Sequence, residues 1–440
     1  MSATVIQLSE WESIGPGDPG GAGLRGLCLN DGRSRAFASE LSRQHLLDVT
    51  ELRHGLSIRT TSWVGRVRLG DLEVVVEPKI APGLLLDLLR YAYGLRDLRL
   101  FEHAEYVEGS GLLIDLLLLQ LHAEAKEILE RGLHRRYRSE SAWLASPRGR
   151  IVLTELVSPG SLTEARLPCR YSSRSADNAL NQALQGGLFL GARMTSSTSL
   201  SISLSHFAGF MAHIIEPVPL TRDLLDRAWR SLNRLNRVYE PALKLVTILL
   251  SGSVLSIEGH GGMELPGFLF DMNRFFQALL ARFLDEYLER WTVHEERGIA
   301  DLMRYLPERN PRLREAPSPR PDFTLIRPGS DPILLDAKYR DLWELPLPRE
   351  MLYQLAIYAL SQRRGATATI LYPTIRSNAK EAAIRISDPI AGGARAFVSL
   401  QPVLLPEIHS IINDSSRHRL ARGRQFVERL CARAALHRRG

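Results

Sequence analysis

The sequence predicts an α/β, multi-domain protein, α+β overall, because of its length and two changes in its hydrophobic pattern. A chain of 440 residues is too long for one compact core and indicates two or three units. Alternation with a period of two dominates the beginning, helical spacing the middle, and a mixture of both the remainder. We therefore expect a β-rich amino-terminal domain at 1–105, a mainly helical region at 106–260 and an α/β domain with a basic tail at 261–440.

The amino-terminal region contains a predicted hairpin. Gly65–Leu69 and Leu72–Glu77 alternate in polarity and are joined by a Gly-Asp turn. The motif Glu77-Pro78-Lys79 follows, and apolar spacing then predicts a helix over Leu84–Tyr93. On physical grounds we interpret Glu77-Pro78-Lys79 as the end of a strand that enters a helix. The glycine- and proline-rich stretch at 15–23 predicts a loop.

The middle region is predicted to be mainly helical. Apolar residues recur with helical spacing at 112–138, 175–195 and 221–250. A glycine cluster at Ser251–Gly262 then predicts a domain boundary.

The last part of the chain mixes helices and strands. Phe268–Trp291 has the spacing of a long amphipathic helix, and Ala316–Pro321 is rich in proline. The pattern next predicts, in order, strands at Asp322–Arg327 and Ile333–Tyr339, a helix at Arg349–Arg363 and a strand at Ala368–Tyr372.

Composition excludes several classes of protein. Hydrophobic residues make up 45% of the chain and charged residues 24%, which argues against a disordered or fibrous protein. The most apolar stretch is interrupted by Asp115 and falls short of a membrane span, and no secretory signal is evident at the start. Cys28, Cys169 and Cys431 have neither disulfide-framework nor zinc-site spacing, so we expect a cytoplasmic protein that binds no membrane.

The positive charge of the chain comes almost entirely from arginine. Lysine occurs only at positions 79, 126, 244, 338 and 380, so 51 of the 56 basic residues are arginine. A pI near 9.4 favours a polyanionic partner, since arginine pairs with phosphate in a fixed two-pronged geometry. A lysine inside a motif is informative here because lysine is so rare.

The strongest chemical signal is the segment PDFTLIRPGSDPILLDAKY at 321–339. Its two predicted strands are joined by a turn that contains proline and glycine. Asp322 opens the first strand, whereas Asp336 and Lys338 end the second and, being two apart, share one face. A tight hairpin brings Asp322 beside them. We therefore predict that two carboxylates and one ammonium group converge at the edge of a small sheet.

Hydrolysis of a phosphodiester needs this set of groups. Carboxylate oxygens of Asp322 and Asp336 are suitable ligands for Mg²⁺, or for Mn²⁺, and the metal activates water and neutralises charge on the phosphate. Lys338 is placed to stabilise the transition state electrostatically. A lone Pro-Asp is usually a turn, and a lone Asp-x-Lys is usually a solvated strand face. Their combination on adjacent strands favours catalysis.

Two further candidates lie on the helix that follows. Gln354 and Tyr358 are four residues apart, so they share one helical face and are placed to lean over the same site. Their alternative role is simple packing of the helix.

Residues 268–373 resemble a PD-(D/E)xK nuclease core, with PD at 321–322, DAK at 336–338 and the QxxxY helix of its RecB-like branch at 354–358. The wider chain resembles the McrC family, the nuclease subunits of McrBC modification-dependent restriction systems. The stretches that carry this resemblance are VGRVRLGDLEVVVEPKI at 64–80, RYRSESAWLASPRGRI at 136–151, SADNALNQAL at 175–184, LNRLNRVYEPAL at 232–243, FLFDMNRFFQALL at 268–280 and YQLAIYA at 353–359.

The resemblance implies a restriction-endonuclease-like fold for 261–440 and a Mg²⁺-dependent endonuclease that cuts double-stranded DNA in defence against foreign DNA. It also implies a partner, a McrB-like AAA+ GTPase hexamer that recognises modified cytosine. In the McrC family the amino-terminal part enters the ring of this partner and stimulates nucleotide hydrolysis, so 1–105 becomes the expected partner-binding domain. Glu77-Pro78-Lys79 is a hallmark of this part in the family.

One position departs from the family pattern. The helix FDMNRFFQ often carries an acidic residue after its second aromatic, where this chain has Gln277. The expected metal site then depends on the two aspartates, with Asp271 as a further candidate acid.

Two other functions remain open. The chain could be a non-catalytic activator of an AAA+ ring with a decayed nuclease fold, which Gln277 favours, or a free-standing RecB-like nuclease. No lysine follows a glycine anywhere, so the chain has no GxxxxGK[ST] phosphate loop, and any motor must lie on another chain. The basic tail Arg417–Gly440 is equally compatible with phosphate contact and with a solvated helix.

Overall fold

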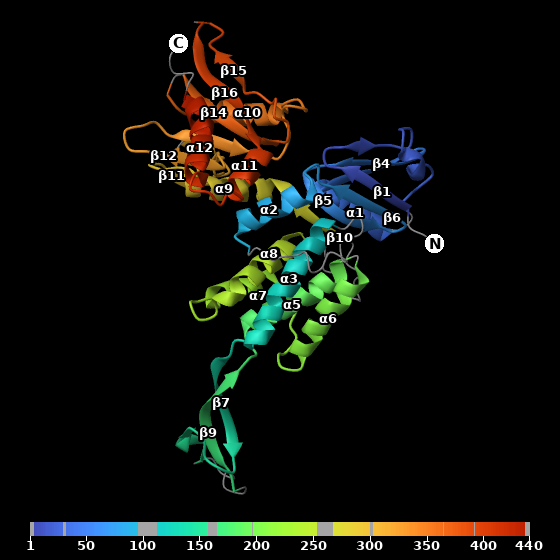
Figure 1. The fold of residues 1–440 in the computed structure, drawn as a ribbon, viewed down its shortest axis with the longest axis vertical. Coiled ribbons are helices and arrows are strands. Elements are labelled where there is room, and N and C mark those ends of the chain that lie inside the picture. The colour runs from blue at the N-terminus through green and yellow to red at the C-terminus, as the bar shows by residue number, and fades with distance from the viewer. Residues whose placement is uncertain are drawn as a thin grey trace. The chain divides into compact units, whose positions relative to one another are not determined.

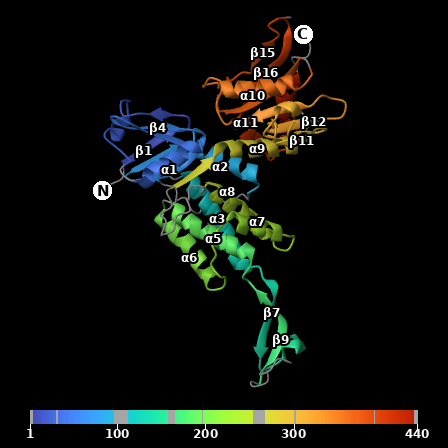
Figure 2. The same ribbon diagram turned by 180° about the vertical axis from the view of Figure 1, so that it is seen from behind.

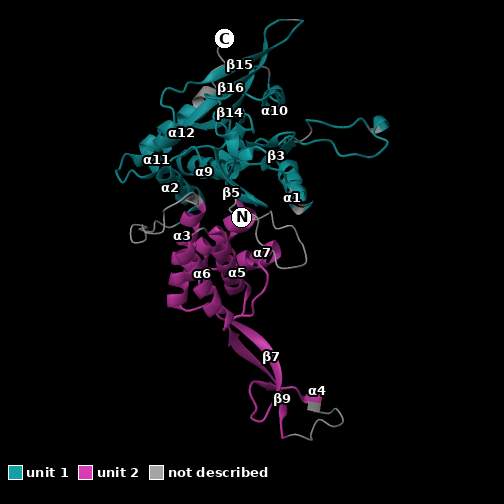
Figure 3. Ribbon diagram, turned by 90° about the vertical axis from the view of Figure 1, so that its right-hand side faces the viewer, with its two compact units in different colours: residues 1–96, 269–440 teal, residues 97–268 magenta. Residues whose placement is uncertain are grey.

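The computed structural model describes residues 4–29, 32–95, 112–156, 165–195, 197–252, 267–299, 302–363, 365–390 and 392–435. The chain divides into two compact units (Figure 3). Unit 1 joins residues 1–96 to residues 269–440, so it contains both the amino-terminal segment and the predicted nuclease region. Unit 2 is residues 97–268. Among the described residues, no helix is both long and apolar enough to span a bilayer.

The amino-terminal part of unit 1 is β-rich, as predicted. It contains the strands β1 (Thr4–Ser9), β2 (Ser13–Ile14), β3 (Leu47–Leu52), β4 (Gly55–Thr60), β5 (Trp63–Leu69) and β6 (Leu72–Glu77), and the helices α1 (Gly32–Arg43) and α2 (Pro82–Tyr93). One sheet has the order β1-β6-β5-β10, where β10 is Gly267–Asp271, and a second has the order β2-β4-β3. The predicted hairpin is confirmed, because β5 and β6 pair antiparallel.

The carboxy-terminal part of unit 1 is built around a six-stranded sheet of order β11-β12-β13-β14-β16-β15 (Figure 1). The strands are β11 (Thr292–Glu295), β12 (Phe323–Ile326), β13 (Ile333–Ala337), β14 (Ala366–Thr374), β15 (Ala382–Ser387) and β16 (Ala394–Leu404). The central strands β13, β14 and β16 run parallel, whereas β12 and β15 are antiparallel to their neighbours. Every residue of β14 is buried, as expected for a central strand covered on both faces.

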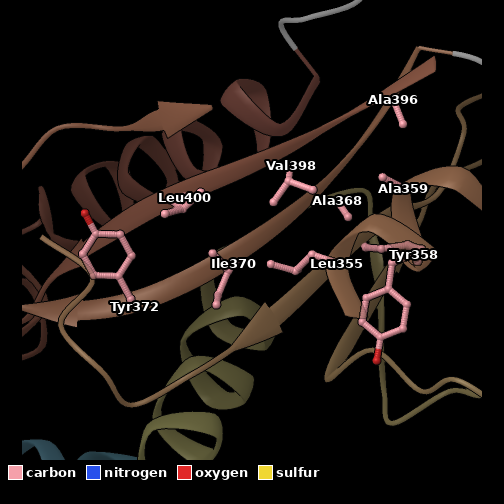
Figure 4. Packing of buried hydrophobic residues seen from close by; sticks show 10 residues of the cluster. Leu355, Tyr358, Ala359, Ala368, Ile370, Tyr372, Ala396, Val398 and Leu400 are labelled. Atoms are coloured by element: carbon pink, nitrogen blue, oxygen red, sulfur yellow. The ribbon is translucent and has the colours of Figure 1, made fainter. Parts of the chain in front are cut away.

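Helices cover both faces of this sheet. They are α9 (Met272–Tyr287), α10 (Arg349–Leu360), α11 (Leu405–Ile412) and α12 (Arg419–Ala435). Helix α12 lies in front of the sheet in Figure 1, whereas α10 lies in front of it in Figure 2, the view from behind. Leu355 and Tyr358 of α10 pack on Leu334, Ala368 and Ile370 of the sheet (Figure 4). Since side chains alternate along a strand, Leu334 and Asp336 of β13 share the face toward α10.

Unit 2 combines a helical bundle with a small sheet. The bundle contains α3 (Leu112–Arg131), α5 (Ala179–Met194), α6 (Thr198–Ala212), α7 (Arg222–Ser231) and α8 (Glu240–Gly252), and α5 packs against the other four. Close approach to α5 requires glycine, since a Cβ at Gly187 would overlap Val246 of α8. The buried Asn181 donates to the carbonyls of His134 and Ala176 and accepts from the Tyr239 hydroxyl at 2.5 Å, so its amide is satisfied.

The small sheet of unit 2 differs from the prediction. Residues 136–138, predicted as helix, belong to β7 (Arg136–Leu144), which pairs with β9 (Leu167–Ser175), and β9 also pairs with β8 (Arg150–Ile151), near the short helix α4 (Leu153–Leu156). Helix α3 ends at Arg131 because Gly132 follows with φ +88°. Both faces of β7 are largely exposed, so its sequence lacks a buried stripe that would reveal a strand.

Two other predicted helices are shorter than expected. Phe268–Trp291 begins as strand β10, and α9 starts only at Met272, because Asp271 caps it by accepting from the N–H groups of Asn273 and Arg274. A short apolar run such as Phe268–Phe270 cannot be assigned by periodicity alone. Residues 221–250 form α7 and α8, separated by a turn in which Asn236 accepts from the N–H of Asn233. Most of the predicted boundary Ser251–Gly262 lies outside the described residues.

Candidate active site

The hairpin β12–β13 places Asp322 directly opposite Asp336. Its antiparallel register pairs Phe323 with Leu335, so the residues one position further toward the open end are the two aspartates. The Asp322 Oδ2 accepts a hydrogen bond from the backbone N–H of Ala337 at 2.7 Å. The side chain of Asp322 is thereby held across the hairpin, beside the end of the second strand.

Lys338 completes the cluster. Its Nζ lies 2.9 Å from Asp336 Oδ2 and 3.6 Å from Asp322 Oδ2. Its backbone N–H donates to the carbonyl of Leu371 at 3.0 Å, so the chain stays attached to β14 after β13 ends. The structure therefore brings together the three groups that the sequence singled out. Their part in catalysis stays a prediction.

Burial dominates the electrostatics of this cluster. The net pKa of Asp336 is raised to about 6, because burial raises it more than the nearby Lys338 lowers it, and the neighbouring Asp322 adds to the rise. Burial lowers the pKa of Lys338, but the two carboxylates outweigh it, so the net shift is upward. Lys338 is consequently a charged ammonium at neutral pH. Ionisation of the buried Asp336 costs free energy unless a cation lies beside it.

One oxygen of this cluster is available for a metal ion. Asp336 Oδ1 is buried and has no hydrogen-bond partner among the described residues, an arrangement that costs free energy unless a ligand satisfies it. Carboxylate oxygens are the donors that Mg²⁺ and Mn²⁺ prefer. Asp322 and Asp336 thus fit a divalent cation. The described part of the chain contains no group of three or more histidine, cysteine, aspartate or glutamate side chains that could hold a metal ion.

Gln354 and Tyr358 contact each other on α10. The Gln354 Nε2 donates to the Tyr358 hydroxyl at 2.7 Å, and this hydroxyl donates to the carbonyl of Arg320 at 2.9 Å. The ring of Tyr358 is buried in the hydrophobic cluster that α10 forms with the sheet, and its oxygen points out of this cluster (Figure 4). Burial, with a smaller contribution from Asp336, raises the pKa of Tyr358, so the hydroxyl remains a donor. The pair therefore fixes the chain two residues before Asp322.

Asp271 and the described basic tail have structural partners. Asp271 caps α9 and its Oδ2 lies 3.9 Å from Arg274 Nε, while Gln277 is half-buried on the same helix. In the basic tail, four arginines of α12 form ion pairs with acidic residues of unit 1. These pairs are Arg419–Glu286, Arg422–Asp414, Arg424–Glu289 and Arg429–Glu407. These four stabilise the docking of α12, which favours the structural interpretation of the tail up to Ala435.

Sequence reasoning missed the residues that hold the chain just beyond Lys338. Glu10 and Trp11, more than 300 residues earlier, hydrogen-bond to Tyr339, and Asn273 of α9 does so from the other side. The feature that distinguishes Glu10 is that this acidic side chain is buried, and burial cannot be seen in a sequence.

One family model and two solved structures are similar to this chain. The family model described as McrBC 5-methylcytosine restriction system component matches residues 58–373. A refined half-complex from the tetradecameric assembly of Thermococcus gammatolerans McrB AAA+ hexamers with bound McrC aligns over 97% of this chain and 100% of its own, at 16% identity and a TM-score of 0.60, which supports a shared fold. The cryo-EM structure of the Thermococcus gammatolerans McrBC complex aligns over 65% of this chain and 88% of its own, at 16% identity and a TM-score of 0.46.

No curated protein matches the sequence significantly. The family model covers well over half of the chain and includes the hairpin β5–β6, the bundle of unit 2 and the cluster around Asp336. The chain belongs to the family of McrBC 5-methylcytosine restriction system components.

Proposed function

We propose that this chain is the endonuclease subunit of a McrBC-type restriction system and hydrolyses DNA phosphodiester bonds at the Asp322–Asp336–Lys338 cluster. The observation that carries the proposal is the convergence of these groups around Asp336 Oδ1, a buried oxygen without a partner among the described residues. The hairpin, the following helix α10 and the strand β14 have the order of a PD-(D/E)xK core, which supports this assignment.

In the proposed mechanism, the carboxylates of Asp322 and Asp336 would hold Mg²⁺ or Mn²⁺. When bound, the cation supplies Lewis acidity, which activates water and neutralises charge on the phosphate. Lys338 carries its positive charge at neutral pH and donates hydrogen bonds to the phosphate oxygens as negative charge develops there. Ala337 N–H keeps Asp322 turned toward the site, and Tyr358 holds the Arg320 carbonyl so that Pro321 and Asp322 enter the hairpin in one geometry.

The chain requires a motor protein in this proposal. It contains no phosphate loop, and the similar solved assembly combines McrC with McrB AAA+ hexamers. We propose a McrB-like AAA+ GTPase hexamer as the partner of this chain and double-stranded DNA as its substrate, with modified cytosine recognised by the partner. We propose that residues 1–105 contact the ring of this partner and stimulate its nucleotide hydrolysis.

A second function has one observation in its favour. The cluster contains two carboxylates, and Gln277 stands where the family often has an acid, which is compatible with an activator of an AAA+ ring that no longer cuts DNA.

The deciding experiment incubates the chain and its cognate AAA+ protein with plasmid DNA that contains 5-methylcytosine, in the presence of nucleotide and Mg²⁺. We expect cleavage by the native chain and none by Asp336→Asn, with equal stimulation of the partner's nucleotide hydrolysis. Stimulation without cleavage by the native chain, in Mg²⁺ and in Mn²⁺, would support the activator instead.

A further inference from the structure

Tyr339, the residue directly after Lys338, is held on three sides. Its backbone N–H donates to Asn273 Oδ1 at 3.1 Å, its carbonyl accepts from Trp11 Nε1 at 3.1 Å, and its hydroxyl donates to Glu10 Oε1 at 3.0 Å. The side chain is buried and packs edge-to-face on Phe276 of α9. Every hydrogen-bonding group of this residue is thus tied to an element distant in sequence.

Glu10 is a buried acid whose placement is explained by this contact. It follows strand β1, and only 1% of the residue's surface is exposed. The same oxygen that accepts from Tyr339 also accepts the backbone N–H of Lys79 at 2.7 Å. Burial raises the pKa of Glu10 to about 7, while the hydrogen bonds from Lys79 and Tyr339 oppose this shift. The Glu77-Pro78-Lys79 segment, which has no partner in the proposed chemistry, here supplies a donor that orients Glu10.

Trp11 adopts an unfavourable backbone conformation at this contact. Its φ is +59°, in the left-handed region that a residue with a large side chain rarely occupies. This turn directs the indole N–H to the Tyr339 carbonyl, and the guanidinium of Arg340 lies 5.0 Å from the centre of the ring. Strained residues persist where surrounding contacts hold them, and they concentrate at functional sites.

The same segment is fixed from its other side by α9. Asn273 accepts from Tyr339 with Oδ1 and donates with Nδ2 to the Ser62 hydroxyl, and the Met272 N–H donates to the Ser62 carbonyl. Ser62 directly precedes strand β5, so the amino-terminal sheet and α9 together enclose the segment that follows β13.

We propose that Glu10 and Trp11 are positioning residues for Lys338. By fixing Tyr339, the next residue, they hold the Lys338 backbone in place and so determine where the lysine Nζ lies. This inference rests on the proposed function of the cluster. Lysine reaches Asp336 through a flexible chain of four carbons, so the direction of its Cα–Cβ bond decides whether Nζ bridges both carboxylates. An error of about 1 Å at a reacting group reduces rates by up to about 100-fold. The amino-terminal sheet is therefore a part of the active-site scaffold.

The test compares two removals of a tyrosine hydroxyl. Tyr339→Phe deletes the bond to Glu10. The control Tyr91→Phe deletes the 2.7 Å bond to Glu286, which likewise joins two distant segments of unit 1, the helices α2 and α9, but lies away from Lys338 in sequence. With the cognate AAA+ protein and methylated plasmid DNA, we expect Tyr339→Phe to lower kcat about 10-fold with an unchanged KM, and Tyr91→Phe to cut like the native chain. Equal kcat for Tyr339→Phe and the native chain would overturn the inference.

Two further variants keep the test decisive if Tyr339→Phe folds poorly. Trp11→Phe removes one donor and keeps a ring, so kcat should fall with KM unchanged. Glu10→Ala removes the acceptor, while Glu10→Gln retains an acceptor oxygen and should restore cleavage. If these residues only stabilise the fold, kcat and the stimulation of the partner should fall together, in proportion to the folded protein that is lost. That result would also overturn the inference.

A second readout does not need cleavage. The chain has five lysines, so acetylation of Lys338 by acetic anhydride can be followed by peptide mass spectrometry in the intact protein. We expect Lys338 to react several-fold faster in Tyr339→Phe than in Tyr91→Phe, because a displaced amine loses its two carboxylate partners. If this difference appears although the native chain cuts no DNA, the positioning role stands and the proposed nuclease function fails. Equal acetylation rates in the two variants would contradict the positioning role.

Discussion

Asp322 accepts the backbone N–H of Ala337 across the hairpin at 2.7 Å, so the first acidic side chain is anchored to the strand that carries the second. One oxygen of Asp322 is thereby engaged, and Lys338 lies 3.6 Å from it. The two aspartates are held by the backbone of one hairpin, and their spacing is set by β-sheet geometry rather than by a flexible loop. A rigid support of this kind is what a metal-binding pair requires.

Replacement of either Asp336 or Lys338 should abolish cleavage. We expect Asp336→Asn and Lys338→Ala to reduce the rate at least about 100-fold, because each removes a charge that acts on the phosphate or its cation. The measurement is cleavage of methylated plasmid DNA with the cognate AAA+ protein, followed on gels.

The matched control for these variants is Asp331→Asn, in the turn of the same hairpin, where the carboxylate pairs with Arg363 at 3.6 Å. It should cut at the native rate. Metal-dependent cutting by Asp336→Asn at that rate would show that the site lies elsewhere.

Divalent cations should stabilise the chain through the same carboxylates. Binding to the native state raises stability by about 2.7 kcal/mol when the ligand is at 100 times its Kd. Titration with Mn²⁺ should therefore raise the Tm of the native chain, and EDTA should return it to its starting value. Asp336→Asn should show no such rise, since it removes the negative charge of the carboxylate whose Oδ1 has no hydrogen-bond partner within the described residues. An equal rise in the variant would exclude Asp336 as a ligand.

Tyr358 should influence cleavage through Asp322 rather than through the phosphate. Tyr358→Phe removes the donor to the Arg320 carbonyl and leaves the buried ring in place. We expect cleavage about 10-fold slower with a Tm within a few degrees of native, because one hydrogen bond contributes about 1 kcal/mol. Gln354→Ala, which removes the bond to the Tyr358 hydroxyl, should have a smaller effect. A larger loss in Gln354→Ala would point to a direct role of the glutamine.

Glu10 should make stability depend on pH near neutrality. Its pKa rises from 4.5 to about 7 on folding, so the folded chain binds the proton more tightly than the unfolded chain. The contribution of this group is therefore largest below pH 4.5 and is lost as pH rises to 7, by about 3 kcal/mol in all. Glu10→Gln cannot titrate, so its Tm relative to the native chain should increase between pH 5 and pH 8. A difference that is constant over this range would contradict the assignment.

Docking of α12 depends on a glycine. A Cβ at Gly423 would overlap the ring of Tyr287, whose hydroxyl accepts from Arg419 Nε at 2.8 Å. We expect Gly423→Ala to destabilise the chain by about 1–3 kcal/mol, measured as a lower Tm. Gly209→Ala in α6 is the control, because its Cβ would meet nothing within 4 Å among the described residues. Alanine is the better helix former there, so this variant should be neutral or more stable. Equal Tm values for both variants would show that α12 can shift away from Tyr287.

Much of the local structure could be predicted from sequence. The hairpins β5–β6 and β12–β13 have turn residues between short apolar strands, and α10 and α2 have clear helical spacing. The predictions were wrong where the signal is weak, as in β7, whose faces are both largely exposed, and β10, a short apolar run in front of a helix. In both cases pairing with another strand decides the structure, and pairing is not a local property.

The residues that could form the candidate site are visible in the sequence alone. Asp322, Asp336 and Lys338 lie within 17 positions of one another, and a hairpin register follows from turn chemistry and the alternation of side chains. The support of that site, in contrast, depends on contacts that form when distant segments pack together. Glu10 and Trp11 reach Tyr339 from the turn that follows β1, and Asn273 reaches it from α9. Contacts between residues so far apart depend on how layers of structure pack, and burial of Glu10 and Tyr339 exists only after that packing.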